Sequence, residues 1–459
     1  AIYMLFHVFL TAYLLAKHQG GKSVKWIYAL IIAFQAFILI FTATRGTILA
    51  LFGAVALTLI LVAIFEKERL KLKKISMGLL TGLVLVAGLF FVIKDSSIVA
   101  KIEPLRRMAE ISLTDRTTTS RFLIWNMAYQ GFKEKPIIGW GQENFIQVFD
   151  KYYDPAMYAQ EPWFDRAHNI FFDWLIAGGI LGLLAYLSLF LFSLISLWKS
   201  RSLSVVQKSL LVSLLAGYFV HNIFVFDNIG SYILFIFTIA LINFHSTDEK
   251  EDVTQASFRP QVYARALVPF VLLLTLFSVY FFNAKGVLAA RALVQAISPA
   301  PGGPAQNLEI FKKASSYDSY GTQEVRERLV TTATNILNVD LSQEIKEGFV
   351  SLARSEMGKE LEANPNSARL QVFMGGFLNR LRLYDEAIPH LEKALEVSPK
   401  KQQIYFEFIT NYLSNNKLDK ALESAKIAYE LDTNFDSARI IYAVTLIYNK
   451  NTSLAEEII

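Results

Sequence analysis

The sequence predicts an all-α protein in two parts, a polytopic helical membrane domain followed by a soluble array of helix pairs. Of the 459 residues, 53% are hydrophobic, which is more than an ordinary soluble globular protein carries. The long apolar runs are confined to residues 1–283. Beyond them, short motifs recur with a period of about 34 residues, which is typical of stacked helix pairs.

Eight apolar stretches in residues 1–283 approach or exceed the length of a bilayer span, which is about 20 residues in a helix. They are 1–16, 26–43, 46–65, 75–93, 170–198, 209–225, 231–244 and 265–283. The 231–244 stretch is short, and we expect it to begin earlier or to tilt. The first stretch is incomplete and the chain begins without Met, so we expect an N-terminally truncated domain.

Lys and Arg in the short connections predict which side of the membrane each connection faces. They are concentrated in 17–25, 66–74, 199–208 and 245–265, the last of which contains Lys250, Arg259 and Arg265. We therefore expect these four connections on the cytoplasmic side of the membrane. The opposite, periplasmic or extracellular side then receives Arg45, the loop 94–169, the connection 221–230 and everything after residue 283.

The loop 94–169 contains a polar, aromatic and basic stretch from Asp115 to His168. Residues 117–133 have helical periodicity, and their aromatic side chains recur on one face at Phe122, Trp125, Tyr129 and Phe132. This pattern predicts an amphipathic helix that lies on the membrane surface. Turn signals at Pro136 and at residues 139–141 end it.

A constant repeat period marks the C-terminal part of the chain. Small Ala side chains recur at this period at Ala353, Ala387, Ala421 and Ala455. Because small residues let paired helices approach, residues 341–459 resemble tetratricopeptide repeats, an α-solenoid. Ala455 falls inside a further repeat, so we expect the array to be C-terminally truncated. Residues 284–340, with the Pro/Gly-rich segment 296–306, are expected to form a linker and helical connector.

Three residues on the expected outer face are the main candidates for chemistry, namely Arg45, Arg121 and His168. A guanidinium between two apolar runs, like that of Arg45, is costly without a partner and is therefore a functional candidate. A histidine at a membrane boundary can accept a proton near neutral pH. Secondary candidates are Arg166, His221 and Asp227.

Each main candidate also has a plain structural interpretation. Arg45 could reach the lipid headgroups, Arg121 could form a surface ion pair, and a lone histidine is more often structural than catalytic. The histidines lack the spacing of metal ligands and the chain contains no cysteine, so we expect no metal site and no cofactor. The net charge of +5 is modest, and no nucleic-acid partner is expected.

Four segments together resemble the O-antigen ligase and O-antigen polymerase superfamily of bacterial membrane glycosyltransferases. They are TRG around Arg45, SRFLIWNMAYQGFKEKPIIGWGQENF from Ser120, AHNIFFDWLIAGGILGLLAYL from Ala167 and VHNIFVFDN from Val220. The resemblance covers about residues 26–245. It departs from the family's pattern at TRG, where the family has SRG, and in the repeat array, which many ligases lack.

The resemblance implies a helical membrane fold related to the type-C glycosyltransferases, with the loop covering the site. It also implies an undecaprenyl-diphosphate-linked glycan as the donor. By the same resemblance, Arg45 and Arg121 hold the lipid diphosphate, and His168 is catalytic. His221 matches more loosely, and Asp227 is inferred only from its place near His221.

The main hypothesis is an inverting, metal-independent glycosyltransferase that moves this glycan onto a glycan, lipid or protein acceptor of the envelope. It could ligate or polymerise. One alternative is a protein O-oligosaccharyltransferase whose repeats recruit acceptor proteins. Another is a non-catalytic membrane scaffold that acts through its repeats, as a spacer or an oligomerisation module. A transporter is disfavoured because no mid-membrane ion pair or broken-helix repeat is evident.

Overall fold

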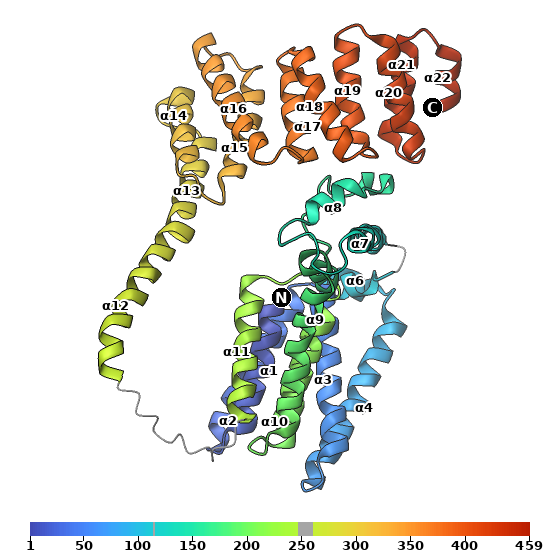
Figure 1. The fold of residues 1–459 in the computed structure, drawn as a ribbon. Helices are drawn as coiled ribbons and strands as arrows, with labels where there is room; N and C mark the ends of the chain where they lie inside the picture. Colours follow the sequence, from blue (N-terminus) through green and yellow to red (C-terminus); the bar gives the residue numbers. More distant parts are fainter. Residues whose placement is uncertain (113–114, 247–259) are drawn as a thin grey trace. The chain divides into compact units, whose positions relative to one another are not determined.

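The computed structural model describes residues 1–112, 115–246 and 260–459, except for the side chains of Arg116 and of residues 260–266. Every regular element in these ranges is a helix, which confirms the predicted all-α class (Figure 1). By their contacts the described residues form two units. One contains residues 1–149 and 164–246, and the other contains residues 150–163 and 260–459.

Among the described residues, six helices are long and apolar enough to cross a membrane. They are α2 (Lys22–Phe41), α3 (Arg45–Phe65), α4 (Leu70–Ile93), α9 (Ile170–Lys199), α11 (Ile229–Ser246) and the continuous helix Leu267–Ile297. The last comprises most of α12 (Pro260–Ser278), η2 (Val279–Ala284) and α13 (Lys285–Ile297). Two shorter apolar helices are α1 (Ile2–Lys17) and α10 (Val205–His221).

Each of the eight predicted stretches thus corresponds to a helix, and the chain is a multi-pass membrane protein. The polar loop between α4 and α9 contains α5 (Ser97–Lys101), α6 (Glu103–Ala109), α7 (Arg116–Glu134), α8 (Phe145–Lys151) and η1 (Pro155–Ala159). Lys250 and Arg259, which contributed to the predicted orientation, lie outside the described residues, as does the side chain of Arg265.

The membrane unit is built around α10, which packs against α3, α1 and α9 (Figure 1). Its side chains are buried along most of its length, including Leu210, Leu214 and Tyr218. Gly217 lets α10 approach α3 closely, because a Cβ at this position would lie 3.0 Å from the Cβ of Ala54. Small residues allow such close packing between membrane helices, where burial from water does not drive association.

The helix α9 is interrupted at Gly179, where φ is 61° and ψ is −157°. The turn that follows α7 fits against this interruption. The Trp140 amide donates to Ile176 O at 2.6 Å, and the Ile180 amide donates to Pro136 O at 2.8 Å. The turn therefore forms hydrogen bonds with backbone groups at the break in α9, as buried backbone at membrane depth requires.

The sequence shows no broken-helix repeat, and it does not predict this single break in α9. Gly178 and Gly179 lie within a continuous apolar run, in which periodicity alone shows no break. The physical reason for the break is backbone proximity. A Cβ on Gly179 would lie 2.3 Å from Ile137 O, a distance that only glycine permits.

Replacing Gly179 with Ala should destabilise the membrane unit. The added methyl group would collide with the Ile137 backbone. In addition, residue 179 has a positive φ, which residues with a side chain rarely adopt. We expect a loss of about 2–5 kcal/mol, seen as a lower melting temperature of the detergent-purified protein. Gly178→Ala is the matched control, because a Cβ at that position would meet nothing within 4 Å. Equal melting temperatures for the two variants would contradict the proposed role of Gly179.

The second unit contains the repeat array, which begins with α13. The helices that follow are α14 (Gly303–Ser316), α15 (Thr322–Ile336), α16 (Gln343–Ala363), α17 (Ala368–Arg380), α18 (Tyr384–Val397), α19 (Gln402–Ser414), α20 (Leu418–Leu431), α21 (Asp436–Tyr448) and α22 (Thr452–Ile458). From α17 onward, first helices begin at residues 368, 402 and 436, and second helices at 384, 418 and 452. Both series advance by the same constant interval, which confirms the tetratricopeptide-type arrangement.

The four predicted contact positions between paired helices, Ala353, Ala387, Ala421 and Ala455, are all at most 2% exposed. The array also extends further toward the N-terminus than its repeating sequence motif. Ala292 of α13 and Phe311 of α14 share one hydrophobic core with Leu378 of α17. Most of the predicted connector 284–340 is therefore packed helix, and only a short part of the predicted linker 296–306 lies outside helices.

The predicted external loop 94–169 is divided between the two units. Residues 150–163 pack with the repeat array, whereas the rest of the loop packs with the membrane unit. The sequence predicts instead that the whole loop belongs to the membrane domain. The aromatic rings of Tyr153 and Trp163 explain the difference, because both rings pack on the ammonium group of Lys401.

Candidate active site

Arg45 opens α3 and forms an ion pair with the polar loop. A tight turn, with Ala43 at a φ of 53°, reverses the chain between α2 and α3. The Arg45 Nη1 lies 2.9 Å from Asp115 Oδ2, and its Nη2 lies 3.7 Å from Glu110 Oε2. Because 32% of the Arg45 side chain is exposed, its guanidinium also remains accessible to a further anion.

Asp115 is the N-terminal capping residue of α7. Its Oδ1 accepts hydrogen bonds from the Thr118 amide at 2.6 Å and the Thr117 hydroxyl at 2.9 Å. Burial opposes ionisation of Asp115, but these hydrogen bonds and the charge of Arg45 outweigh it and lower the pKa to about 2. Asp115 is therefore a carboxylate at neutral pH, and it holds Arg45 at the start of α7.

Arg121 lies further along α7 and is half-buried. Within the part of the chain that the structure describes, its guanidinium forms no hydrogen bond or ion pair. Burial lowers the pKa of Arg121, the charge of Arg45 lowers it further, and the charge of Asp115 opposes both. Arg45 and Arg121 thus influence each other electrostatically, and an anion would relieve their repulsion.

His221 lies at the C-terminal end of α10 and is 6% exposed. Its Nδ1 is 3.2 Å from the Thr47 hydroxyl, in the first turn of α3. A Cβ on Gly46 would lie 3.8 Å from the same nitrogen. The structure therefore brings His221 against the residues that directly follow Arg45.

His168 precedes α9 and adopts a left-handed backbone conformation, with φ at 51°. Its ring lies edge-to-face with Phe164 and Phe226, at centroid distances of 5.6 Å and 5.2 Å. The backbone beside it is held from two directions. The Ala167 amide donates to Asp173 Oδ1 at 2.8 Å, and Ala167 O accepts from the Trp125 indole at 3.1 Å.

A small cavity of about 60 Å³ lies in the membrane unit near His168. Its lining includes Arg166, Asp173, Trp174, Phe226, Asp227 and Tyr232. Arg166 forms an ion pair with Glu143 and lies 5.8 Å from the centre of the Phe226 ring. Among the described residues, Asp173 Oδ2 has no hydrogen-bond partner, so an acceptor atom is available within this lining.

Asp227 lies between α10 and α11 and accepts hydrogen bonds from several protein groups. Its donors include the hydroxyls of Tyr218 and Tyr186 and the side-chain amide of Asn222. Burial raises the pKa of Asp227, although these hydrogen bonds partly offset it. Because the donors come from α9, α10 and the residue after α10, the geometry of Asp227 is that of a carboxylate that ties these elements together.

The structure gathers the predicted residues into two groups. The basic cluster comprises Arg45 and Arg121, with His221 packed beside the first turn of α3. The histidine group comprises His168 with Arg166 and Asp227. The last two line the small cavity, and His168 packs against Phe226, which also lines it. Trp125 connects the groups, because it lies one turn after Arg121 on α7 and donates to the residue before His168. Its ring also stacks on Phe172 of α9, 6.1 Å away.

Sequence reasoning missed the specific roles of Asp115, Asp173 and Trp125. Trp125 was expected on a membrane-facing surface, but it packs inward, while Phe122 and Tyr129 are each 48% exposed. The buried face of α7 carries Ile124, Met127 and Ala128 instead. Across residues 1–112, 115–246 and 260–459, no group of three His, Asp or Glu side chains is placed to hold a metal ion.

The fold and this site define a multi-pass helical membrane protein with a polar, arginine-containing site at the ends of its spans and a helix-pair array. Residues 29–187 match the family model of the O-antigen ligases. This match supports an O-antigen ligase-type membrane enzyme, a family that implies a glycan-lipid donor and an acceptor. Arg45, Arg121 and His168 lie inside the matched residues, whereas His221 and Asp227 follow them.

Several solved structures resemble part of the chain, among them two of MamA. "MamA RS-1 ArsTM double mutant" is 18% identical, with 39% of this chain and 92% of that chain covered, at a TM-score of 0.29. "MamA 41-end from Desulfovibrio magneticus RS-1" is 19% identical, with 38% and 89% covered, also at a TM-score of 0.29. A comparison with curated protein sequences found no match.

Removing the charge of Asp115 should destabilise the protein in a pH-dependent way. Since the pKa of Asp115 falls from the ordinary value of 3.8 to about 2, its ionised form stabilises the fold fully above about pH 4. That contribution is lost as the pH falls through about 2. The melting temperatures of wild type and Asp115→Asn, compared from pH 7 to pH 2, should therefore converge at the acidic end. Asp95→Asn, at an exposed position of the same loop, is the control. A wild-type advantage that persists unchanged at pH 2 would refute this role.

Proposed function

We propose that this chain transfers an undecaprenyl-diphosphate-linked glycan onto an acceptor of the bacterial envelope. The observation that carries the proposal is the half-buried Arg121 guanidinium, which has no ion-pair partner among the described residues. It is influenced electrostatically by Arg45, inside the part of the chain that matches the O-antigen ligases. A diphosphate carries concentrated negative charge, and guanidinium groups bind phosphate oxygens through paired hydrogen bonds. The donor's diphosphate is therefore the anion that we assign to the basic cluster.

In the proposed reaction the sugar–phosphate bond breaks and the lipid diphosphate leaves with the electron pair. Negative charge on the leaving group grows as this bond breaks, so Arg45 and Arg121 stabilise the transition state more than the bound donor. Asp115 holds Arg45 in place through their 2.9 Å ion pair. The two guanidiniums supply the positive charge for departure, and the proposal assigns no role to a metal ion.

His168 is the proposed general base. It removes the proton from the attacking acceptor hydroxyl while the new glycosidic bond forms, and attack opposite the leaving group inverts the anomeric carbon. Its left-handed backbone is held by the contacts of Ala167 with Asp173 and Trp125. Asp173 and Arg166, which both line the small cavity, are the groups that we propose to accept from and donate to sugar hydroxyls.

The proposed location is the bacterial inner membrane, with the site on the periplasmic or extracellular side. Two features of the described residues support this. The short connections 17–25 and 66–74 carry the concentrated Lys and Arg of the cytoplasmic side, whereas Arg45 and the start of the polar loop follow the opposite ends of α2 and α4. The C-terminal array then follows the outward end of the last apolar helix.

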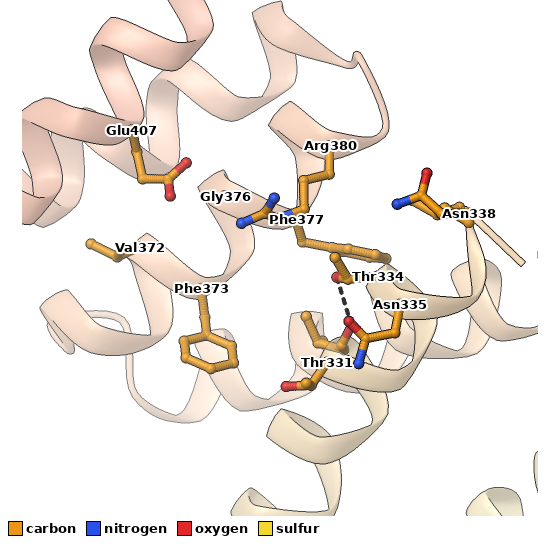
Figure 2. Close-up of a pocket in the computed structure, with 12 residues that line it drawn as sticks. Thr331, Thr334, Asn335, Asn338, Val372, Phe373, Gly376, Phe377, Arg380 and Glu407 are labelled. Atoms are coloured by element: carbon orange, nitrogen blue, oxygen red, sulfur yellow. Dashed lines mark hydrogen bonds between the residues drawn. The ribbon is translucent and has the colours of Figure 1, made fainter. Parts of the chain in front are cut away.

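A protein acceptor is the second candidate, and one feature of the repeats favours it. A pocket of about 610 Å³ is lined by residues of α15, α17 and α19, which are first helices of successive pairs. In Figure 2, Arg380 and Glu407 both project toward this pocket, beside the ring of Phe373. A pocket with both charges and an aromatic ring suits a peptide segment. Glycoproteomics of a deletion strain tests this candidate, which fails if protein glycosylation is unchanged while polysaccharide is lost.

Replacing either arginine of the basic cluster should abolish glycan transfer without preventing membrane insertion. We expect Arg45→Ala and Arg121→Ala each to lower turnover by about 10²- to 10³-fold, because each removes one charge from the leaving-group site. Transfer is measured with purified protein and lipid-linked donor. The matched control is Arg107→Ala, since Arg107 lies in the same loop but forms an exposed ion pair with Glu103. Full activity of Arg121→Ala would rule out the assignment.

His168→Ala should separate chemistry from donor binding. Loss of the general base lowers turnover by about 10²- to 10⁴-fold, whereas the diphosphate contacts of the basic cluster are kept. We expect donor-induced thermal stabilisation to match that of wild type while transfer is lost. His390→Ala, in the repeat array, is the control and should transfer normally. If His168→Ala retained transfer, or if it lost donor stabilisation to the same extent as Arg121→Ala, His168 would not be the base.

A further inference from the structure

A buried lysine of the repeat array holds part of the polar loop. Lys401, in the connection before α19, is only 1% exposed. Its ammonium nitrogen lies 4.2 Å from the Tyr153 ring centre and 3.9 Å from the Trp163 ring centre, and it donates to Pro162 O. A lysine is almost never fully buried unless its charge is compensated. Here the compensation comes from the loop segment 150–163.

The same segment meets equivalent positions of three successive repeats. Near its start, the carboxylate of Asp150 accepts from the Ala368 backbone, at the beginning of α17. In its middle, Pro155 O accepts from the Gln402 side chain at 3.3 Å, at the beginning of α19. Tyr158 then stacks on Phe435, just before α21, at a centroid distance of 4.4 Å.

These contacts follow the period of the array. The residues Ala368, Gln402 and Asp436 begin the first helices of their repeats, and the segment touches each repeat at or next to that position. We name this row, made of Ala368, Lys401, Gln402, Asn434 and Phe435, the repeat edge. It differs from the pocket of Figure 2, whose lining shares none of these residues.

Two buried ionisable groups, Asp150 of the segment and Lys401 of the array, lie at this contact and influence each other electrostatically. Asp150 is 1% exposed, like Lys401, and burial raises the pKa of the Asp150 carboxyl and lowers that of the Lys401 ammonium. Burying two such groups is costly unless each is close to opposite charge. A loop that merely rests on a surface can leave its ionisable groups in water and avoids this desolvation free energy. Two buried ionisable groups, together with the ring and carbonyl contacts of Lys401, are therefore typical of a specific binding site.

The bound segment lies directly beside the candidate catalytic residue in the chain. Phe149 and Phe164, which flank it, pack together with ring centres 5.5 Å apart. Phe164 also packs against the ring of His168. A left-handed backbone such as that of His168 costs free energy and persists only when its surroundings restrain it. Restraining residues 150–163 restricts the short stretch that leads to His168.

We propose that the repeat edge is a binding site for the chain's own segment 150–163, and that Lys401 is a positioning residue for His168. The catalytic part of this proposal rests on the proposed transferase function, whereas the restraint of residues 164–168 does not. In this scheme the array acts on the ligase-type domain of the same chain. Partner binding at the pocket of α15, α17 and α19 is a separate property.

Hydrogen–deuterium exchange of the full-length protein in nanodiscs tests the restraint. The variants are Lys401→Gln, with Lys401→Arg as the conservative rescue, and Tyr158→Ala at the margin of the contact. Tyr448→Ala, an exposed tyrosine on α21, is the matched control. We expect exchange in residues 150–168 to rise about 2- to 10-fold in Lys401→Gln and Tyr158→Ala. Exchange in helices α17 to α21 should be unchanged, which shows that the array remains folded.

Transfer kinetics on the same proteins test positioning. Lys401→Gln should lower kcat about 10- to 100-fold with the donor KM unchanged, and Lys401→Arg should restore most of it. Unchanged exchange in residues 150–168 for both variants would overturn the binding site. Faster exchange with an unchanged kcat would overturn the positioning role. If wild type transfers no glycan, the proposed function fails, while the exchange data still decide whether the edge restrains residues 164–168.

Discussion

The membrane unit depends on the backbone hydrogen bonds between the turn after α7 and the break in α9. At Gly179 the helix cannot satisfy its own amide and carbonyl groups, and the backbone of residues 136–141 completes them. This fixes the end of α7 against α9. His168 precedes α9 and Arg121 lies on α7. These hydrogen bonds therefore also fix the two groups of the candidate site relative to each other.

The two arginines of the basic cluster differ in their ion-pair partners. Arg45 has Asp115 and a more distant Glu110, whereas Arg121 has no ion-pair partner among the described residues. On the other side of Trp125, Asp227 accepts from tyrosine hydroxyls and an amide, and Asp173 keeps one oxygen without a partner. Positive charge is therefore available on one side of the indole, and hydrogen-bond acceptors lie on the other. The proposed donor, with its diphosphate and its sugar, would use both.

The sequence predicts the features that local periodicity encodes. Apolar runs of span length and the regular recurrence of Ala in the repeats are readable without tertiary information, and both are confirmed. The break at Gly179 depends on the approach of Ile137, so the glycine pair alone did not reveal it. The Arg45–Asp115 contact joins residues 70 positions apart, which no spacing rule connects. Lys401, in a polar connection between repeats, looks like a solvated lysine until the aromatic rings that cover it are known.

The contact of Lys401 with the loop has a consequence for biosynthesis. Lys401 and Pro162 are 239 positions apart, and Tyr158 and Asn434 are 276 apart. At a translation rate of about 5–20 residues per second, the loop waits roughly ten to fifty seconds before its binding site has been made. A nascent chain that ends before α17 contains the spans, Arg45, Arg121 and His168, but it lacks the repeats that bind segment 150–163. Under the proposed positioning role of Lys401, the site is assembled only after the repeats that bind segment 150–163 have been synthesised.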